Sequence, residues 1–135
     1  MRLFISIPLF VYLLILANIM MFAGAPDAPM MNIILSQFGM PSGSVVTITV
    51  SDLLIMIAVL FLYMETFKAT RTSVLSIIDH SLSLVVFVIF LIEFIVVEQV
   101  GNSTFLILTL ASLMDVVTGF TVTISTAKRD IAFGG

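Results

Sequence analysis

The sequence predicts an all-α integral membrane protein built as a bundle of four transmembrane helices. Hydrophobic residues make up 61% of the 135 residues, and charged residues only 10%. Soluble domains are about 45–50% apolar and about 25% charged, so a soluble fold could not bury this much apolar surface. Four long apolar runs divide the chain, and every Lys and Arg falls where four crossings would place it on one side of the membrane. We therefore expect one transmembrane domain over residues 1–135, with lipid as its solvent.

The first apolar run covers residues 3–23, close to the roughly 20 residues that a helix needs to cross a hydrocarbon core about 30 Å thick. A signal peptide is the alternative, because Ala23, Gly24 and Ala25 have the small-x-small form of a cleavage site. The run is longer than the apolar region of about 7–15 residues that is usual in signal peptides, and Pro26 follows the site directly. We therefore expect a retained helix.

Residues 24–44 form the one long connection, which Gly and Pro residues punctuate as loop. Inside it, four apolar residues recur at the i, i+3, i+4 and i+7 positions of a helix: Met31, Ile34, Leu35 and Phe38. This spacing predicts a short helix over residues 30–38 that lies at the membrane surface or caps the bundle.

The second apolar run covers residues 45–66, and Ser42 or Ser44 is a suitable N-cap for it. The third run covers about residues 79–97. Directly before it, the tetrapeptide Ser-Ile-Ile-Asp that ends at Asp79 has the spacing of a capping box.

The fourth run covers about residues 104–127 and follows a tight turn over residues 98–103. In that turn Gly101 can adopt a positive φ, and Asn102 or Ser103 can cap the next helix. The segment Asn-Ser-Thr that starts at Asn102 also has the form of a glycosylation acceptor. Its closeness to both spans favours the capping role.

The basic residues predict the orientation. With four spans they all lie on one side, at the two ends of the chain and in the second connection: Arg2, Lys68, Arg71, Lys128 and Arg129. The positive-inside rule then places both termini in the cytoplasm. We also expect Lys68, Arg71, Lys128 and Arg129 to contact anionic lipid headgroups. Size and composition are typical of a small multi-pass protein of a bacterial inner membrane.

Three acidic residues interrupt the apolar runs, where ionisable side chains are rare and costly. At 1.5 Å per residue, Asp52 and Glu93 lie about 8–10 Å from the outer ends of their helices, and Asp115 lies about 16 Å deep. No Lys or Arg occupies this layer, so an isolated carboxylate would become protonated rather than stay charged. We expect these acids, with Ser112 and Thr118 beside Asp115, to form a proton or cation site or to link helices by hydrogen bonds.

Small residues recur every four positions around Asp115, at Ala111, Gly119 and Thr123. Such a face allows helices in a membrane to approach closely. We expect this small-residue face to pack against other helices and to hold an oligomer or a larger complex together.

Another polar group is expected at the cytoplasmic end, where Glu65 and Lys68 are three residues apart and can pair. His80, next to Asp79, could titrate near neutral pH and relay protons towards the interior. The alternative is an interfacial histidine within a salt-bridged collar. We therefore regard His80, Asp79 and Glu65 as a candidate relay at the cytoplasmic mouth.

Several classes of function are excluded by the residues that are absent. Without Cys the chain has no disulfide, thiol nucleophile or thiolate metal site. It shows no phosphate loop, nucleotide fingerprint, zinc motif or Ser-His-Asp arrangement, and five basic residues are too few for nucleic acid. The methionines near the first connection could ligate cuprous ion, but a soft apolar cap explains them. We expect no enzymatic activity, no cofactor and no metal.

Two functions remain. The first is a non-enzymatic subunit or oligomeric component of a membrane complex, whose partners are the bilayer and either further copies of the chain or other membrane subunits. The alternative is a proton- or cation-conducting unit that uses Asp115, Glu93 and Asp52, with His80 at its cytoplasmic mouth.

Overall fold

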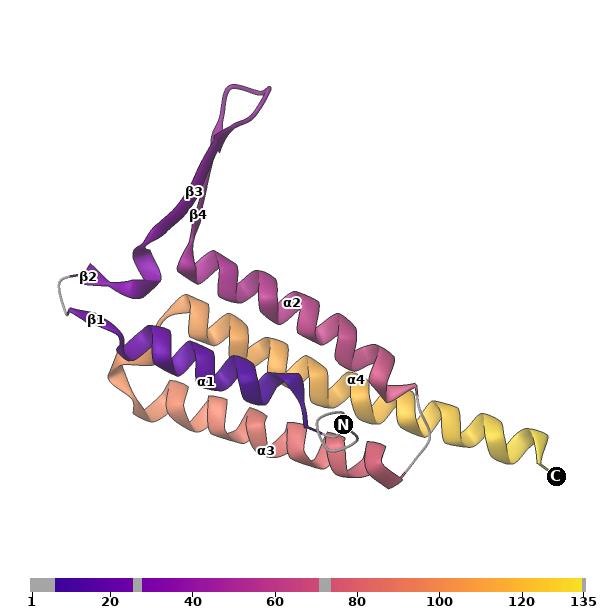
Figure 1. Cartoon of the computed structure of the whole chain (residues 1–135). Helices are drawn as coiled ribbons and strands as arrows, with labels where there is room; N and C mark the ends of the chain where they lie inside the picture. Colours follow the sequence, from indigo (N-terminus) through magenta and orange to yellow (C-terminus); the bar gives the residue numbers. More distant parts are fainter. Residues whose placement is uncertain (1–6, 26–27, 71–73, 135) are drawn as a thin grey trace.

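The computed structural model describes residues 7–25, 28–70 and 74–134. The protein is mostly helical, at 76%. Successive helices run in opposite directions, and α1 and α4 each pack against both α2 and α3 (Figure 1). Their bounds are α1 Leu9–Phe22, α2 Val50–Ala69, α3 Val74–Val96 and α4 Ser103–Phe133.

Three of these helices, α2, α3 and α4, are long and apolar enough to cross a membrane. The described part of the first predicted span, 3–23, forms the shorter helix α1, whose 14 residues extend about 21 Å. A helix of that length is shorter than a hydrocarbon core of about 30 Å. Pro8 stands at its N-cap, because proline fits the start of a helix and not its interior. Residues 3–6 of the predicted span lie outside the described residues.

The bundle has two distinct ends. At the Lys68 end, α2 finishes and α1 and α3 begin, and Lys68 is paired with Asp79 of α3. At the hairpin end, α1 and α3 finish and α2 and α4 begin. There the hydroxyl oxygens of Ser51 and Thr104 are 2.7 Å apart and join the starts of α2 and α4. In Figure 1, α4 continues past the other helices at the Lys68 end.

The apolar core is concentrated in the half of the bundle towards the hairpin end. The rings of Phe90 and Phe105 pack there with their centroids 5.4 Å apart. All four helices contribute buried apolar side chains to this core: Phe10, Leu13, Ala17, Leu54, Ala58, Val86, Phe90, Phe105 and Leu108. The half towards the Lys68 end instead buries most of the polar side chains that are described below.

The predicted surface helix over residues 30–38 is wrong. Only a 3-10 turn, Met30–Asn32, is helical there, and β3 (Ile34–Gly39) pairs antiparallel with β4 (Val45–Thr49). Gly43 has a φ of +86° in the turn between them, and β4 is rich in β-branched residues, which favour strands. The hairpin projects from the bundle, crosswise to the helices (Figure 1). Two shorter strands, β1 (Gly24–Ala25) and β2 (Ala28–Pro29), precede it.

The hairpin also moves the start of the second helix from residue 45 to Val50. The N-cap is Thr49, not Ser42 or Ser44. Its hydroxyl accepts from the backbone N–H of Asp52, and the Asp52 carboxylate accepts from the backbone N–H of Thr49 at 2.9 Å. This reciprocal arrangement is a capping box.

The other helix ends differ from expectation in part. Helix α3 begins at Val74, so the tetrapeptide that ends at Asp79 lies inside the helix and does not cap it. Asn102 is confirmed as the N-cap of α4, because its side-chain oxygen accepts from the backbone N–H of Phe105 at 3.0 Å. Gly101 has a φ of −72°, so its predicted positive φ is wrong, and a 3-10 turn, Glu98–Val100, makes the connection.

Helix α4 ends at Phe133 rather than at residue 127. Lys128 and Arg129 are exposed on its last part. The segment contains no helix breaker before Gly134, so nothing in the sequence stops the helix at the end of the apolar run.

Candidate polar site between α2, α3 and α4

Lys68 lies between two buried carboxylates. Its Nζ atom is 2.9 Å from an oxygen of Glu65, one turn away on α2, and 3.3 Å from an oxygen of Asp79 on α3. Glu65 and Asp79 are only 2% and 4% exposed. The predicted pairing of Glu65 with Lys68 is confirmed. Lys68 points to these two carboxylates, which differs from the expected contact with lipid headgroups.

The start of α1 joins the same cluster. The backbone N–H of Leu9, the first residue of α1, donates to Glu65 at 2.6 Å, and Lys68 donates to the carbonyl oxygen of Ile7 at 3.3 Å. The first N–H groups of a helix have no partner within the helix and attract negative charge. Glu65 therefore anchors α1 to α2 as well as holding Lys68.

His80 is buried between α3 and α4, with 2% of its surface exposed. Its Nε2 atom is 2.9 Å from the hydroxyl of Thr123, and the Nδ1 side of the ring lies against Gly119. The Thr123 hydroxyl also donates to the carbonyl oxygen of Ala69 at the end of α2, at 3.5 Å. His80 therefore lies inside the bundle and connects three helices.

Asp115 and Ser83 form the deepest part of this polar region. They are 3% and 2% exposed, and Ser83 on α3 lies beside the carboxyl group of Asp115 on α4. Among the described residues, neither the Ser83 hydroxyl nor the Oδ2 atom of Asp115 has a hydrogen-bond partner. Such a pair of unsatisfied buried groups is unusual in a folded protein.

The two residues that were expected beside Asp115 differ from Ser83 in their burial or hydrogen bonding. Ser112 is buried, and its hydroxyl donates to the carbonyl oxygen of Thr109 in its own helix, at 2.8 Å. Thr118 is half-buried. Ser83 was missed in the sequence as a site residue, although it lies three positions after His80 and so on the same face of α3.

The three acids of the apolar runs do not form one cluster. Asp52 is exposed and caps α2 at the hairpin end. Glu93 is half-buried and accepts from the amide of Asn18 at 2.8 Å, which ties α3 to α1. The prediction that Asp52 lies about 10 Å inside its helix and shares a polar site with Glu93 and Asp115 is wrong, because α2 begins five residues later than predicted. Asn18 is the most polar interruption of the first apolar run and was the available signal for this contact.

The small-residue face of α4 packs inside the chain. Gly119 lies against His80 of α3, Thr123 contacts the end of α2, and Ala111 packs against the apolar core. Because its own α2 and α3 occupy this face, it is not the surface that would hold an oligomer together. Of the other expected headgroup ligands, Lys128 and Arg129 are exposed and Arg71 lies outside the described residues.

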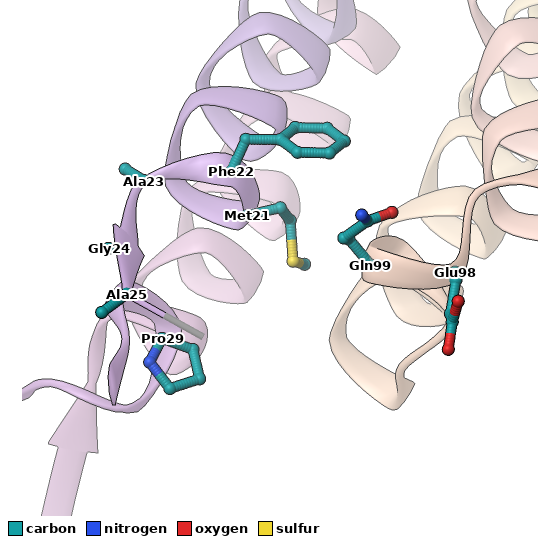
Figure 2. A pocket seen from close by; sticks show the side chains of 8 residues that line it. All are labelled: Met21, Phe22, Ala23, Gly24, Ala25, Pro29, Glu98 and Gln99. Atoms are coloured by element: carbon teal, nitrogen blue, oxygen red, sulfur yellow. The ribbon is translucent and has the colours of Figure 1, made fainter. Parts of the chain in front are cut away.

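A separate hollow of about 560 Å³ lies at the hairpin end. The end of α1 and the strand after it line one side, and the 3-10 turn before α4 lines the other (Figure 2). Among the described residues that line it, Glu98 is the one titratable side chain, and it is exposed. Within the described residues, no group of three or more His, Cys, Asp or Glu side chains is arranged to hold a metal ion.

Comparisons of the chain with models of protein families, with curated proteins and with solved structures find no match. The chemistry of the site is therefore argued from its own geometry. It combines a Lys68 cluster of two buried carboxylates and one ammonium group, a buried histidine, and a buried acid with one unsatisfied oxygen.

Proposed function

We propose that this protein is a non-enzymatic component of a membrane complex in a bacterial inner membrane. In this proposal all four helices cross the bilayer, both termini are cytoplasmic, and the hairpin projects on the opposite side. The exposed Lys128 and Arg129 at the Lys68 end support this orientation, because cytoplasmic segments are enriched in basic residues. The observation that carries the proposal is the uncovered β3–β4 hairpin.

Two neighbouring residue pairs place apolar side chains on one face of the hairpin and polar side chains on the other. Phe38 pairs with Val46 on the apolar face, and these side chains are 46% and 36% exposed. Gln37 pairs with Thr47 on the opposite face, where the Gln37 amide donates to the Thr47 hydroxyl at 3.2 Å. Residues 28–51 contain no charged side chain. This segment therefore has few polar side chains to interact with water.

A two-stranded hairpin is marginally stable on its own, and both of its edges present backbone groups that can pair with another strand. All residues of β3 are exposed, so the described part of the chain does not cover it. A partner protein that adds a strand to an edge would pair the free backbone groups, and one that covers Phe38 and Val46 would bury their apolar side chains. We therefore place the partner surface on the hairpin and not on α4.

The test is the mass of the protein component after extraction from native membranes in a mild detergent. We expect the full chain to migrate as an assembly larger than one chain and Phe38→Ser to release it as a monomer. Gln37→Ser is the matched control, because it changes the neighbouring residue on the polar face and should leave the assembly intact.

A monomeric wild-type chain, both in detergent and after cross-linking in native membranes, would contradict the proposal. So would an assembly that Phe38→Ser leaves intact. The measured mass also separates a homo-oligomer from a complex with other subunits.

A further inference from the structure

We infer that Asp115 is a proton-exchange site that communicates with the Lys68 end of the bundle through His80 and is closed towards the hairpin end. This inference is independent of the hairpin and of any partner. It assigns a role to Asp115, a buried acid that lies away from the proposed partner surface.

The first observation is the unsatisfied pair at Asp115 and Ser83. A buried polar group without a partner costs about 1–3 kcal/mol, so two such atoms side by side need an explanation. A proton on Oδ2 of Asp115 changes that oxygen from an acceptor into a donor, and the neighbouring Ser83 hydroxyl is then a suitable acceptor. Loss of the proton reverses the roles, because the Ser83 hydroxyl can donate to the carboxylate.

The second observation is the position of His80. The Nδ1 side of its ring lies against Gly119, one helical turn after Asp115 on α4. On α3, Ser83 is three residues from His80, so the two side chains lie on the same helix face. The other ring nitrogen, Nε2, is 2.9 Å from Thr123, towards the Lys68 end. One ring nitrogen, Nε2, therefore faces the Lys68 end, and the other, Nδ1, faces the part of α4 that carries Asp115.

Charged groups at the Lys68 end face this route from two helices. They are Glu65 and Lys68 on α2 and Asp79 on α3, and all three lie within electrostatic reach of Asp115. Helix α1 contributes the N–H of Leu9, and the titratable side chain in its first turn, Tyr12, is exposed. Two carboxylates and one ammonium group leave this cluster with one negative charge when all are ionised, and Lys128 and Arg129 of α4 are exposed beyond it.

The exchange step balances with one proton. In the tautomer that carries its hydrogen on Nδ1, with the Thr123 hydroxyl turned to donate to Nε2, a proton from hydronium at the Lys68 end binds Nε2. Nδ1 then gives up its proton, which moves past Ser83 to Oδ2 of Asp115. A neutral carboxylic acid results, and the reverse sequence returns the proton to the same side. No oxidant, reductant or second substrate is needed.

Towards the hairpin end the route is closed. Phe90, Phe105 and Leu108 are fully buried there and fill the bundle. The hydroxyls of Thr109 and Ser112 donate to carbonyl oxygens of their own helix. The site therefore exchanges protons with one side and does not conduct them across the membrane.

The first test is infrared difference spectroscopy of the full chain in liposomes during a pH titration. We expect the C=O band of a protonated carboxylic acid that is lost as the pH rises and is absent in Asp115→Asn. Glu93→Gln, which alters the acid of the other interhelical contact, should retain the band. Asp115→Glu keeps a carboxyl group and should show a shifted band, which covers the case in which the asparagine variant fails to fold.

The second test follows the rate at which this band responds to a pH jump. His80→Gln should slow the response at least tenfold and leave its final amplitude unchanged. An unchanged rate would overturn the route, and identical spectra for wild type and Asp115→Asn would overturn the site. Liposomes with a pH gradient and a potassium–valinomycin potential should hold their gradient, and dissipation that Asp115→Asn abolishes would overturn the closed end.

Discussion

The imidazole ring of His80 occupies the space that a side chain at Gly119 would need. A Cβ atom built at Gly119 would stand 2.5 Å from Nδ1 of His80 and 2.8 Å from its Cε1. Real Cβ atoms essentially never show contacts this short, so a residue other than glycine must displace the ring. Gly119 thus fixes both the spacing of α3 and α4 and the position of the buried histidine.

Gly119→Ala should therefore destabilise the bundle, by about 1–3 kcal/mol, as overpacking of a filled interior does. Unfolding by denaturant in detergent, followed by circular dichroism, measures the loss. Gly39→Ala is the matched control, because no atom lies within 4 Å of the added Cβ. Combining Gly119→Ala with His80→Ala should recover part of the loss, and strictly additive losses would contradict the contact.

Lys68→Met should destabilise the protein by about 3 kcal/mol, because it leaves two buried carboxylates without their cation. The same unfolding experiment measures this, with Lys128→Met as the control, since Lys128 is exposed on the last part of α4. Equal stability of the two variants would contradict the ion pairs of the Lys68 cluster.

The role of Asp115, Gly119 and Thr123 as one face of a helix could be predicted from the sequence, because their spacing is a local property of a helix. The cap at Asn102 was predictable for the same reason. The neighbour of Asp115 was not, because the contact with Ser83 depends on the register between α3 and α4, which no local pattern encodes.

The hairpin also could not be predicted from a local pattern. The apolar residues of 30–38 fit a helical spacing, but a run this short also fits a strand. The strand that pairs with β3 is β4, which lies beyond a turn. Its apolar residues run directly into those of α2, so the sequence predicts a helix from residue 45 onwards. That reading also placed Asp52 too deep, because the helix begins five residues later than its apolar run.

Thr49→Ala should cost about 1 kcal/mol through the loss of the N-cap of α2. Ser44→Ala, at one of the two residues that the sequence suggests as the cap, should change the free energy of unfolding by less than about 0.5 kcal/mol. A larger loss at Ser44 than at Thr49 would mean that the helix begins at residue 45 after all.

Asn18→Leu should loosen α1 from α3, because Glu93 then loses the amide that donates to it. We expect a loss of about 1 kcal/mol, the net contribution of a typical hydrogen bond, because both partners are half-buried. Glu93→Gln keeps a carbonyl oxygen as acceptor and should lose less. If both variants are as stable as wild type, this contact does not hold α1 in place.

The position of Asp115 inside the membrane is the central claim, and labelling of single cysteines tests it most directly, because the chain has no native cysteine. Cysteines replace three exposed residues: Ser44 in the hairpin turn, Val117 beside Asp115, and Ala127 near the end of α4. A membrane-impermeant maleimide added to intact cells should label Ser44→Cys, should label Ala127→Cys only after the membrane is opened, and should label Val117→Cys only after denaturation. Labelling of Ser44→Cys and Ala127→Cys from the same side, or of Val117→Cys in the intact membrane, would contradict the account.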